Sequence, residues 1–158
     1  MTPAVQLLEG QGLPYQVHAY PHNPGADSYG DEAVAALGLS AHQVFKTLVA
    51  ELDGAELVVA VVPVSAMLNT KALAKTLSAK KAVLADKQKV SRVTGYVLGG
   101  VSPLGQKKRL RTVIDQSARN LSTIHVSAGR RGLEIELAPD ILAKLCQASF
   151  ADIAVDNT

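Results

Sequence analysis

The sequence predicts a single α+β domain whose sheet is largely antiparallel. The chain has 158 residues and no linker, repeat or low-complexity tract, which favours one domain with one core. Two pairs of strand-like segments are each separated by a short, glycine-containing turn, and such turns are typical of hairpins. Residues that cap helices stand between these segments, so we expect helices to pack on the sheet.

The first half of the chain contains the clearest strand pair. Two apolar runs flank Asp53-Gly54, a dipeptide that favours the tight turn of a hairpin. The expected elements are, in order, a helix from residue 3 to about 10, a strand over 15–20, a turn-rich loop over 21–25, a helix over 31–37 and the hairpin strands 44–52 and 57–63.

The second half predicts further helices and a second hairpin. Asn69 and Asp86 have side chains that cap helices, and Pro139 favours the first turn of a terminal helix. The expected elements are, in order, a helix from residue 70 to about 77, a strand over 81–84, a helix after residue 86, strands over 110–114, 123–126 and 133–137, and the terminal helix.

Composition excludes several classes of protein. The net charge of +2 is too small for a general affinity for nucleic acid, so such binding must come from local patches at 107–111 and 130–131. The single cysteine, Cys146, excludes an internal disulfide, favours a reducing cytoplasm and is expected to be a core residue. A secretory signal and an apolar run of about 18 residues are both missing, so we expect a soluble, cytoplasmic protein.

The most distinctive segment is the glycine-rich run 94–109, which ends in three consecutive cations. Its glycines allow the backbone to approach a ligand closely, and cations supply the charge that phosphate prefers. The run lacks the lysine and hydroxyl of a P-loop and the glycine spacing of a Rossmann fingerprint. Taken alone, it fits either an ordinary loop or a site that binds an anion.

Lys46 lies inside an apolar strand, which is an unusual place for a lysine. Because side chains alternate along a strand, Lys46 shares a face with Val44, Leu48 and Ala50. That face is either solvated or places the amine in a pocket, where it holds a phosphate or a carbonyl group. The pattern alone leaves both possibilities open.

The usual catalytic constellations are missing from the sequence. The histidines at 18, 22, 42 and 125 lack the spacing of a zinc-binding helix, so we expect neither a metal nor a cofactor. His18 and His22 are expected at the surface. The Gly-x-Ser-x-Gly turn of a serine hydrolase is also missing. We assign Asp31 and Glu32 to the start of the second helix, where carboxylates offset the helix dipole.

With these residues in view, the chain resembles the YbaK family of Cys-tRNA(Pro) deacylases, relatives of the editing domain inserted in bacterial prolyl-tRNA synthetases. The resemblance covers nearly the whole chain, and its ungapped motifs follow one another in order. It implies one aminoacyl-tRNA editing domain over 1–158, with a mixed, barrel-like sheet and flanking helices. The motifs are Met1-Thr-Pro-Ala-Val, Gly30-Asp31-Glu32, Phe45-Lys46-Thr47-Leu48, Thr94-Gly-Tyr, Gly99-Gly-Val-Ser-Pro-Leu-Gly-Gln-Lys-Lys-Arg109 and Val126-Ser-Ala-Gly-Arg-Arg-Gly-Leu133.

The resemblance also implies a reaction and its residues. The thiol of a cysteine wrongly attached to proline tRNA attacks its own ester, so the enzyme positions the ester and stabilises charge. Lys46 is expected to hold the terminal phosphate or polarise the ester, and the backbone of Gly99 and Gly100 to bind the carbonyl or the ribose hydroxyls. The other expected residues are a substrate-binding set, Tyr20, Thr47, Val101, Ser102, Pro103, Ser127 and Gly129, and a tRNA-binding set, Lys107, Lys108, Arg109, Arg130 and Arg131.

The partner implied by the resemblance is the acceptor end of a mischarged tRNA(Pro). Prolyl-tRNA synthetase is expected to supply tRNA identity in a ternary complex. Two alternatives stay open: a deacylase that uses water to release alanine or serine, and a module that binds RNA or a synthetase without turnover. A requirement for the substrate thiol separates the first alternative, and dependence on Lys46 separates the second.

Overall fold

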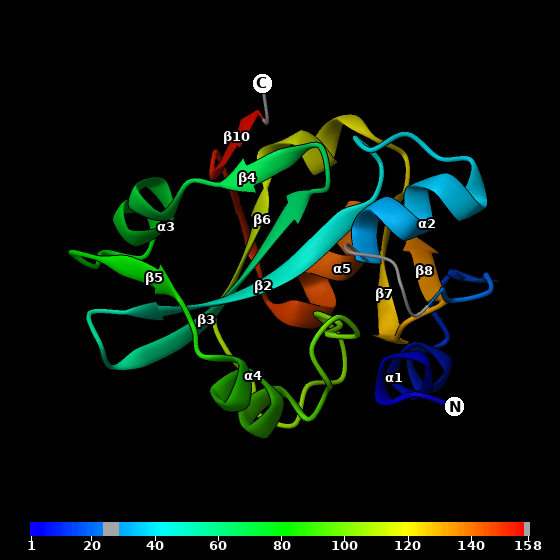
Figure 1. Cartoon of the computed structure of the whole chain (residues 1–158), viewed down its shortest axis with the longest axis horizontal. Coiled ribbons are helices and arrows are strands. Elements are labelled where there is room, and N and C mark those ends of the chain that lie inside the picture. The colour runs from blue at the N-terminus through cyan, green and yellow to red at the C-terminus, as the bar shows by residue number, and fades with distance from the viewer. Residues whose placement is uncertain (24–28, 157–158) are drawn as a thin grey trace.

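A five-stranded sheet forms the centre of the molecule. The computed structural model describes residues 1–23 and 29–156, so Pro24 and Gly25 of the expected loop lie outside the described residues. The strand order of this sheet is β5-β2-β3-β6-β9, and a three-stranded sheet β1-β8-β7 and a two-stranded sheet β10-β4 accompany it. Figure 1 shows the β2–β3 hairpin crossing the middle of the molecule, with α2 and α4 on either side of β2.

The helices and strands follow the expected order. The helices are α1 (Pro3–Gln11), α2 (Tyr29–Leu37), α3 (Thr70–Thr76), α4 (Lys87–Thr94), the 3-10 helix η1 (Gln116–Asn120) and α5 (Pro139–Cys146). The strands are β1 (Gln16–Ala19), β2 (Phe45–Leu52), β3 (Glu56–Pro63), β4 (Ala66–Leu68), β5 (Ala82–Leu84), β6 (Thr112–Asp115), β7 (Ile124–Arg130), β8 (Leu133–Leu137), β9 (Ser149–Ala151) and β10 (Ala154–Asp156). No described helix is long and apolar enough to span a membrane.

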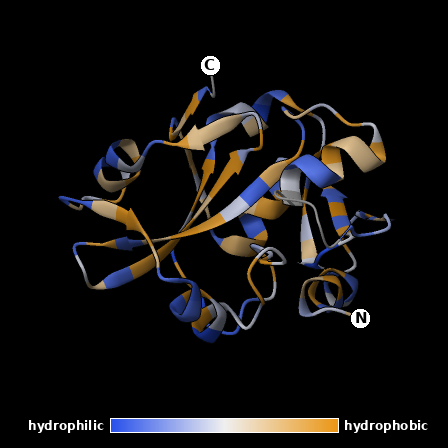
Figure 2. Cartoon of the chain, viewed as in Figure 1, coloured by the Kyte–Doolittle hydropathy of each residue, from blue (hydrophilic) through white to orange (hydrophobic). Residues whose placement is uncertain are grey.

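The β2–β3 hairpin confirms the strongest sequence signal. Asp53 and Gly54 have φ angles of 52° and 67°, which is the conformation that a tight hairpin turn requires. Alternate residues of β3 enter two different hydrophobic clusters: Val59 and Val61 pack with α1 and the three-stranded sheet, whereas Ala60 packs with α3. The central sheet is therefore covered on both faces. Figure 2 shows that hydrophilic residues interrupt the otherwise hydrophobic β2.

The three-stranded sheet packs α1 against one face and meets the central sheet at one point. Val44, just before β2, forms a parallel bridge with His125 of β7, and the His125 N–H donates to the Gln43 carbonyl at 3.0 Å. The two sheets share one hydrophobic core, which contains Val59 and Val61 of β3 and Ile124 and Val126 of β7. The arrangement is barrel-like without being a closed barrel, and it confirms the α+β class with a mostly antiparallel sheet.

Some features of the fold are not predicted by the sequence. Strands β4, β9 and β10 are three residues long, which is too short to show an alternating pattern. The pairs β3–β6 and β6–β9 are parallel. Parallel neighbours need a long connection, and no local turn signals their pairing.

Candidate active site

A cavity of about 510 Å³ is lined by residues from both larger sheets. Volumes of about 300–1,000 Å³ are usual for sites that enclose a small molecule or the end of a larger one. The walls come from β2, the start of α2, α4 with the loop that follows it, and the β7–β8 hairpin. Segments far apart in the sequence thus meet around one space, and most of the expected site residues lie on these segments.

The β2 wall contains Lys46 and Thr47. Lys46 is half-buried, and this burial lowers the pKa of its amine, while the Asp31 carboxylate acts in the opposite direction. The Thr47 Oγ1 is shielded from solvent and has no hydrogen-bond partner within the described part of the chain. Lys46 thus lines the pocket, one of the two possibilities left open by the sequence, and the next strand position carries a hydroxyl with unused hydrogen-bonding capacity.

Glu134 of β8 also lines the cavity, although the sequence assigned it no role. Glu134 is 6% exposed, and no hydrogen bond or ion pair of its carboxyl is found among the described residues. Burial raises the pKa of Glu134 to about 8. Tyr20 also lines the cavity, and burial raises the pKa of its phenol, with the charge of Glu134 adding to the effect.

Glu134 was missed because its strand alternates apolar and acidic residues. Such alternation is typical of a strand with one solvated face. In the structure that face is covered, and Glu134 pairs in register with Ser127 of β7, which also lines the cavity. The neighbouring segments of the fold, rather than the strand itself, hide the carboxyl from water.

The start of α2 supplies a second acidic group and positions an arginine. Asp31 lines the cavity, although the sequence placed it only at a helix start. His22 lies between Glu32 and Arg131. The His22 Nδ1 is 2.7 Å from a Glu32 carboxylate oxygen, and the His22 Nε2 accepts a hydrogen bond from the Arg131 Nη1 at 2.9 Å. Because a guanidinium only donates, Nδ1 must carry the proton and donate to Glu32. This chain of contacts orients Arg131 at the cavity.

The glycine-rich loop lines the cavity with its first part. Gly99 and Val101 face the cavity, and their N–H groups have no backbone partner among the described residues. The Gly100 N–H instead donates to the Val97 carbonyl at 2.9 Å. A Cβ on Gly100 would lie 2.8 Å from the Arg130 Cα, so this glycine allows the loop to pack against the end of β7.

Three other expected substrate-binding residues support the loop and the hairpin. Ser102 is 0% exposed, and its Oγ accepts a hydrogen bond from the Leu104 N–H. The Pro103 carbonyl accepts a hydrogen bond from the Cys146 Sγ at 3.3 Å, next to a separate, smaller cavity. Gly129 donates its N–H to the Ser127 Oγ at 3.1 Å and lies against the Tyr96 ring.

The expected tRNA-binding cations form two groups. Arg130 and Arg131 line the cavity at the end of β7. Lys107, Lys108 and Arg109 are exposed on the last part of the loop. The N–H groups of Lys107 and Lys108 donate to carbonyls of Thr94 and Val93 at 2.9 and 3.2 Å, which holds this segment against the end of α4.

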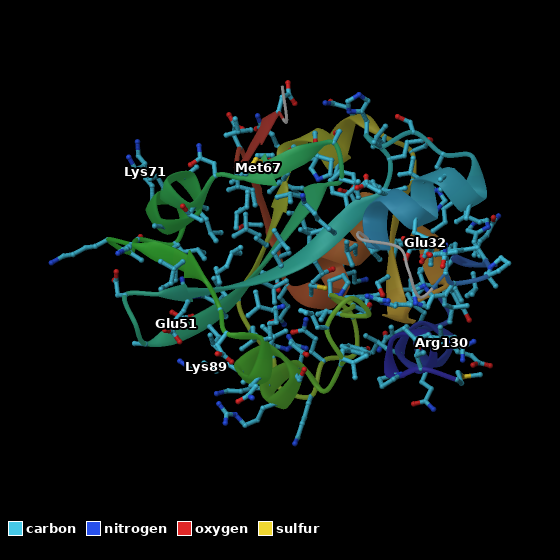
Figure 3. The ribbon with its side chains drawn as sticks, in the orientation of Figure 1. Glu32, Glu51, Met67, Lys71, Lys89 and Arg130 are labelled. Atoms are coloured by element: carbon cyan, nitrogen blue, oxygen red, sulfur yellow. The ribbon has the colours of Figure 1, made fainter. Side chains whose placement is uncertain are left out.

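An ion pair fixes α4 beside β2. The Lys89 Nζ lies 2.9 Å from a carboxylate oxygen of Glu51, and Figure 3 shows the two side chains together at the lower left. Lys87 and Val90 of the same helix line the cavity. The ion pair thus helps to hold α4, which forms part of the cavity wall, beside β2.

Comparison with known proteins first defines the class of fold. The chain has a TM-score of 0.83 and 22% identity to the structure described as "a putative trans-editing enzyme for prolyl tRNA synthetase", and the match covers 97% of both chains. At that identity the likeness establishes the fold alone.

The sequence then establishes the family: the chain belongs to the aminoacyl-tRNA editing domain family, whose profile matches residues 22–145. It is 37% identical to the protein named "Putative Cys-tRNA(Pro)/Cys-tRNA(Cys) deacylase EbsC" from Enterococcus faecalis, over 96% of this chain and 92% of that protein. It is also 26% identical to the uncharacterized protein YwhH of Bacillus subtilis, over 80% and 78% of the two chains. The resemblance drawn from the motifs is confirmed at the level of the family.

Proposed function

We propose that this chain is an aminoacyl-tRNA deacylase whose substrate is Cys-tRNA(Pro). Membership of the editing family supports deacylation, and the name of the Enterococcus relative supports the cysteine substrate. The cavity lining supports this proposal most directly: its described residues include the Lys46 amine, the buried Glu134 carboxyl and the hydroxyls of Tyr20, Thr47 and Ser127, but no cysteine and no histidine to activate a hydroxyl. Such a site binds and orients an ester better than it attacks one.

The substrate itself supplies the nucleophile in this mechanism. The cysteine sulfur bonds to its own ester carbonyl carbon, the bond from that carbon to the ribose oxygen breaks, and the ribose oxygen receives the thiol proton. The products are tRNA with a free terminal hydroxyl and a small cyclic thioester, which water then opens. The protein has to fold the aminoacyl group back on itself and stabilise the negative charge on the carbonyl oxygen.

Lys46 and the glycine-rich loop stabilise that charge. The Lys46 amine, on the β2 wall, donates to the carbonyl oxygen or to the terminal phosphate. Gly99 and Val101 line the cavity, and their N–H groups, without a backbone partner among the described residues, are the proposed donors of the loop. The role first expected for Gly100 passes to these two residues, because the Gly100 N–H is already bonded to Val97.

Glu134 binds the free α-amino group of the aminoacyl ester. A carboxyl that is 6% exposed and unpaired among the described residues is stabilised when a ligand brings a cation to it. Ser127 and Tyr20 lie on the same side of the cavity and offer hydroxyls to the rest of the aminoacyl group. The α-amino group, the ester and the phosphate then each meet a different wall.

The tRNA acceptor end enters over the arginines at the cavity and the exposed cations of the loop. Arg130 and Arg131 lie closest to the ester, and Lys107, Lys108 and Arg109 follow along the loop. These groups contact phosphates and carry no sequence information. We assign the selection of the tRNA to prolyl-tRNA synthetase in a ternary complex. We place this complex in the cytoplasm.

Side-by-side deacylation of tRNA(Pro) carrying cysteine, serine, alanine or proline tests the mechanism. Serine differs from cysteine by one atom, and its hydroxyl is a much weaker nucleophile than a thiol. We expect release of cysteine far faster than of the other three. Equal release of cysteine and alanine would mean that water is the nucleophile. Failure to release any of them would leave a binding module.

A chemically blocked substrate tests the role of Glu134. N-acetyl-Cys-tRNA(Pro) lacks the charged amine, so we expect wild type and Glu134→Gln to deacylate it at the same rate. On unblocked Cys-tRNA(Pro) the variant should be slower. An equal loss on both substrates would remove the α-amino group as the partner of Glu134.

A further inference from the structure

A second cluster of ligand-type side chains lies on the three-stranded sheet, outside the lining of the cavity. His18 of β1, His125 of β7 and Glu136 of β8 each offer one donor atom, and these atoms all lie within 4.8 Å of one another. His125 and Glu136 are register partners, and His18 stands opposite Glu134, two positions before Glu136. Side chains in this register share one face of a sheet, so the pairing gathers them.

The carboxylate of Glu136 is already oriented toward the histidines. Its Oε1 lies 2.8 Å from the His18 Nε2, and its Oε2 accepts a hydrogen bond from the Thr123 hydroxyl at 2.6 Å. The rings of His18 and His125 are 5.3 Å apart between centroids. In metal sites, ligating carboxylates are held by such an outer hydrogen bond, which leaves the other oxygen for the ion.

His125 provides the second, independent observation. It is 4% exposed, and its Nδ1 is shielded from solvent without a hydrogen-bond partner in the described part of the chain. A buried polar atom without a partner is destabilising, so native structures rarely leave one. The imidazole thus stands beside a histidine and a carboxylate with part of its bonding capacity unused.

We propose that His18, His125 and Glu136 bind one divalent transition-metal ion of the zinc class. Two imidazoles and one carboxylate are a donor set that zinc accepts, and its bonds of about 2.0–2.2 Å require the three donor atoms, now within 4.8 Å of one another, to move closer together when the ion binds. The ion replaces the direct contact between the His18 Nε2 and the Glu136 Oε1. It ties the edge strand β1 to the β7–β8 hairpin, whose β8 also carries Glu134.

The sequence predicted no metal because the ligands come from three separate strands. Zinc sites are recognised in sequences by short, fixed spacings between ligands. Here the register of the sheet, rather than the spacing, brings the donors together, so this site is visible only in three dimensions. Its three ligands are not among the residues that line the cavity, although His18 stands opposite Glu134, and metal binding is measured separately from deacylation.

Metal binding by untagged protein, stripped with a chelator, tests this site. Zn²⁺ is titrated by calorimetry, and Co²⁺ is followed by its visible absorption, for wild type, His18→Ala, Glu136→Gln and the control His42→Ala. His42 is a histidine whose Nδ1 contacts the Ser65 hydroxyl rather than a carboxylate. We expect one ion per wild-type or control chain, and at least tenfold weaker binding by His18→Ala and Glu136→Gln.

Glu136→Gln keeps the test independent of folding. The glutamine has the size of the glutamate and still accepts the hydrogen bond from Thr123, so the metal-free variant should keep its circular dichroism spectrum. The proposal is overturned if wild type binds no ion stoichiometrically. It is equally overturned if His18→Ala or folded Glu136→Gln binds Zn²⁺ as tightly as wild type.

Discussion

Two strands that line the cavity, β2 and β8, each bury a group of opposite charge without an ion pair in the described part of the chain. Lys46 on β2 is half-buried, and Glu134 on β8 is 6% exposed. Burial lowers the pKa of the amine and raises the pKa of the carboxyl to about 8, so each group is pushed toward its neutral form. Among the described residues, neither wall supplies an ion pair that would reverse this. Both groups therefore fit the proposal that a ligand supplies the missing opposite charges.

The largest expected effect comes from removing the charge on the β2 wall. Lys46→Ala should lower kcat/KM for Cys-tRNA(Pro) by at least about 100-fold, or about 2.7 kcal/mol, because the developing negative charge loses its donor. Stability should change by less than about 1 kcal/mol, since the buried amine is itself unfavourable. The matched control is Lys71→Ala, an exposed lysine on α3. Activity of Lys46→Ala within about threefold of wild type would place this lysine outside the reaction.

Removing the charge of Glu134 on β8 should raise stability, by an amount that depends on pH. The pKa of Glu134 is raised in the folded protein above its unfolded value, so the folded state holds a proton longer and wild-type stability falls as pH rises toward 8. Glu134→Gln should therefore be more stable than wild type by about 2–3 kcal/mol at about pH 8.5, with a much smaller gain near pH 4.5. Urea unfolding at both values measures this. A gain that does not grow with pH contradicts the buried, unpaired carboxyl.

A substitution where the glycine-rich loop packs against β7 tests the shape of the cavity without changing its charge. Gly100→Ala places a Cβ at 2.8 Å from the Arg130 Cα, and because the neighbour is backbone, the loop has to shift. We expect the free energy of unfolding to fall by about 1–3 kcal/mol and KM to rise. Gly10→Ala in α1 is the control, because nothing lies within 4 Å of its Cβ, and it should stabilise the helix by about 0.5–1 kcal/mol. Thermal melting distinguishes the two, and equal melting temperatures would refute the close packing.

The sequence predicted the fold where the information is local. Asp53-Gly54 specifies its hairpin, and Asn69 and Asp86 cap their helices through hydrogen bonds to Ala72, Gln88 and Lys89. The parallel neighbours of β6 depend on contacts between distant segments. No single stretch of residues encodes these contacts, so they became visible only in the structure.

The site residues show the same division between local and non-local information. Lys46 is conspicuous because a cation interrupts an apolar strand, whereas Glu134 is inconspicuous because an acidic residue in an alternating strand resembles a solvated one. Whether segments distant in the sequence bury an acidic side chain decides whether it lies in a site or in solvent. The roles of Ser102, Pro103 and Gly129 remain predictions from the resemblance, and their observed contacts support the loop and the hairpin.

The smallest effects should come from the cations beyond the two walls. Arg130 lines the cavity, Lys108 is exposed on the loop, and Figure 3 shows Arg130 and Lys71 on opposite sides of the molecule. Removing one cation that binds a phosphate should weaken tRNA binding several-fold at low salt and lower the salt dependence of log K by about 0.7–0.9. KM measured from low to moderate salt should therefore show a shallower slope for Lys108→Ala and Arg130→Ala than for Lys71→Ala.

Because Arg130 borders the proposed ester site, its variant should also lower kcat, whereas Lys108→Ala should leave kcat unchanged. Identical slopes for all three variants would show that the acceptor end approaches the cavity from another side.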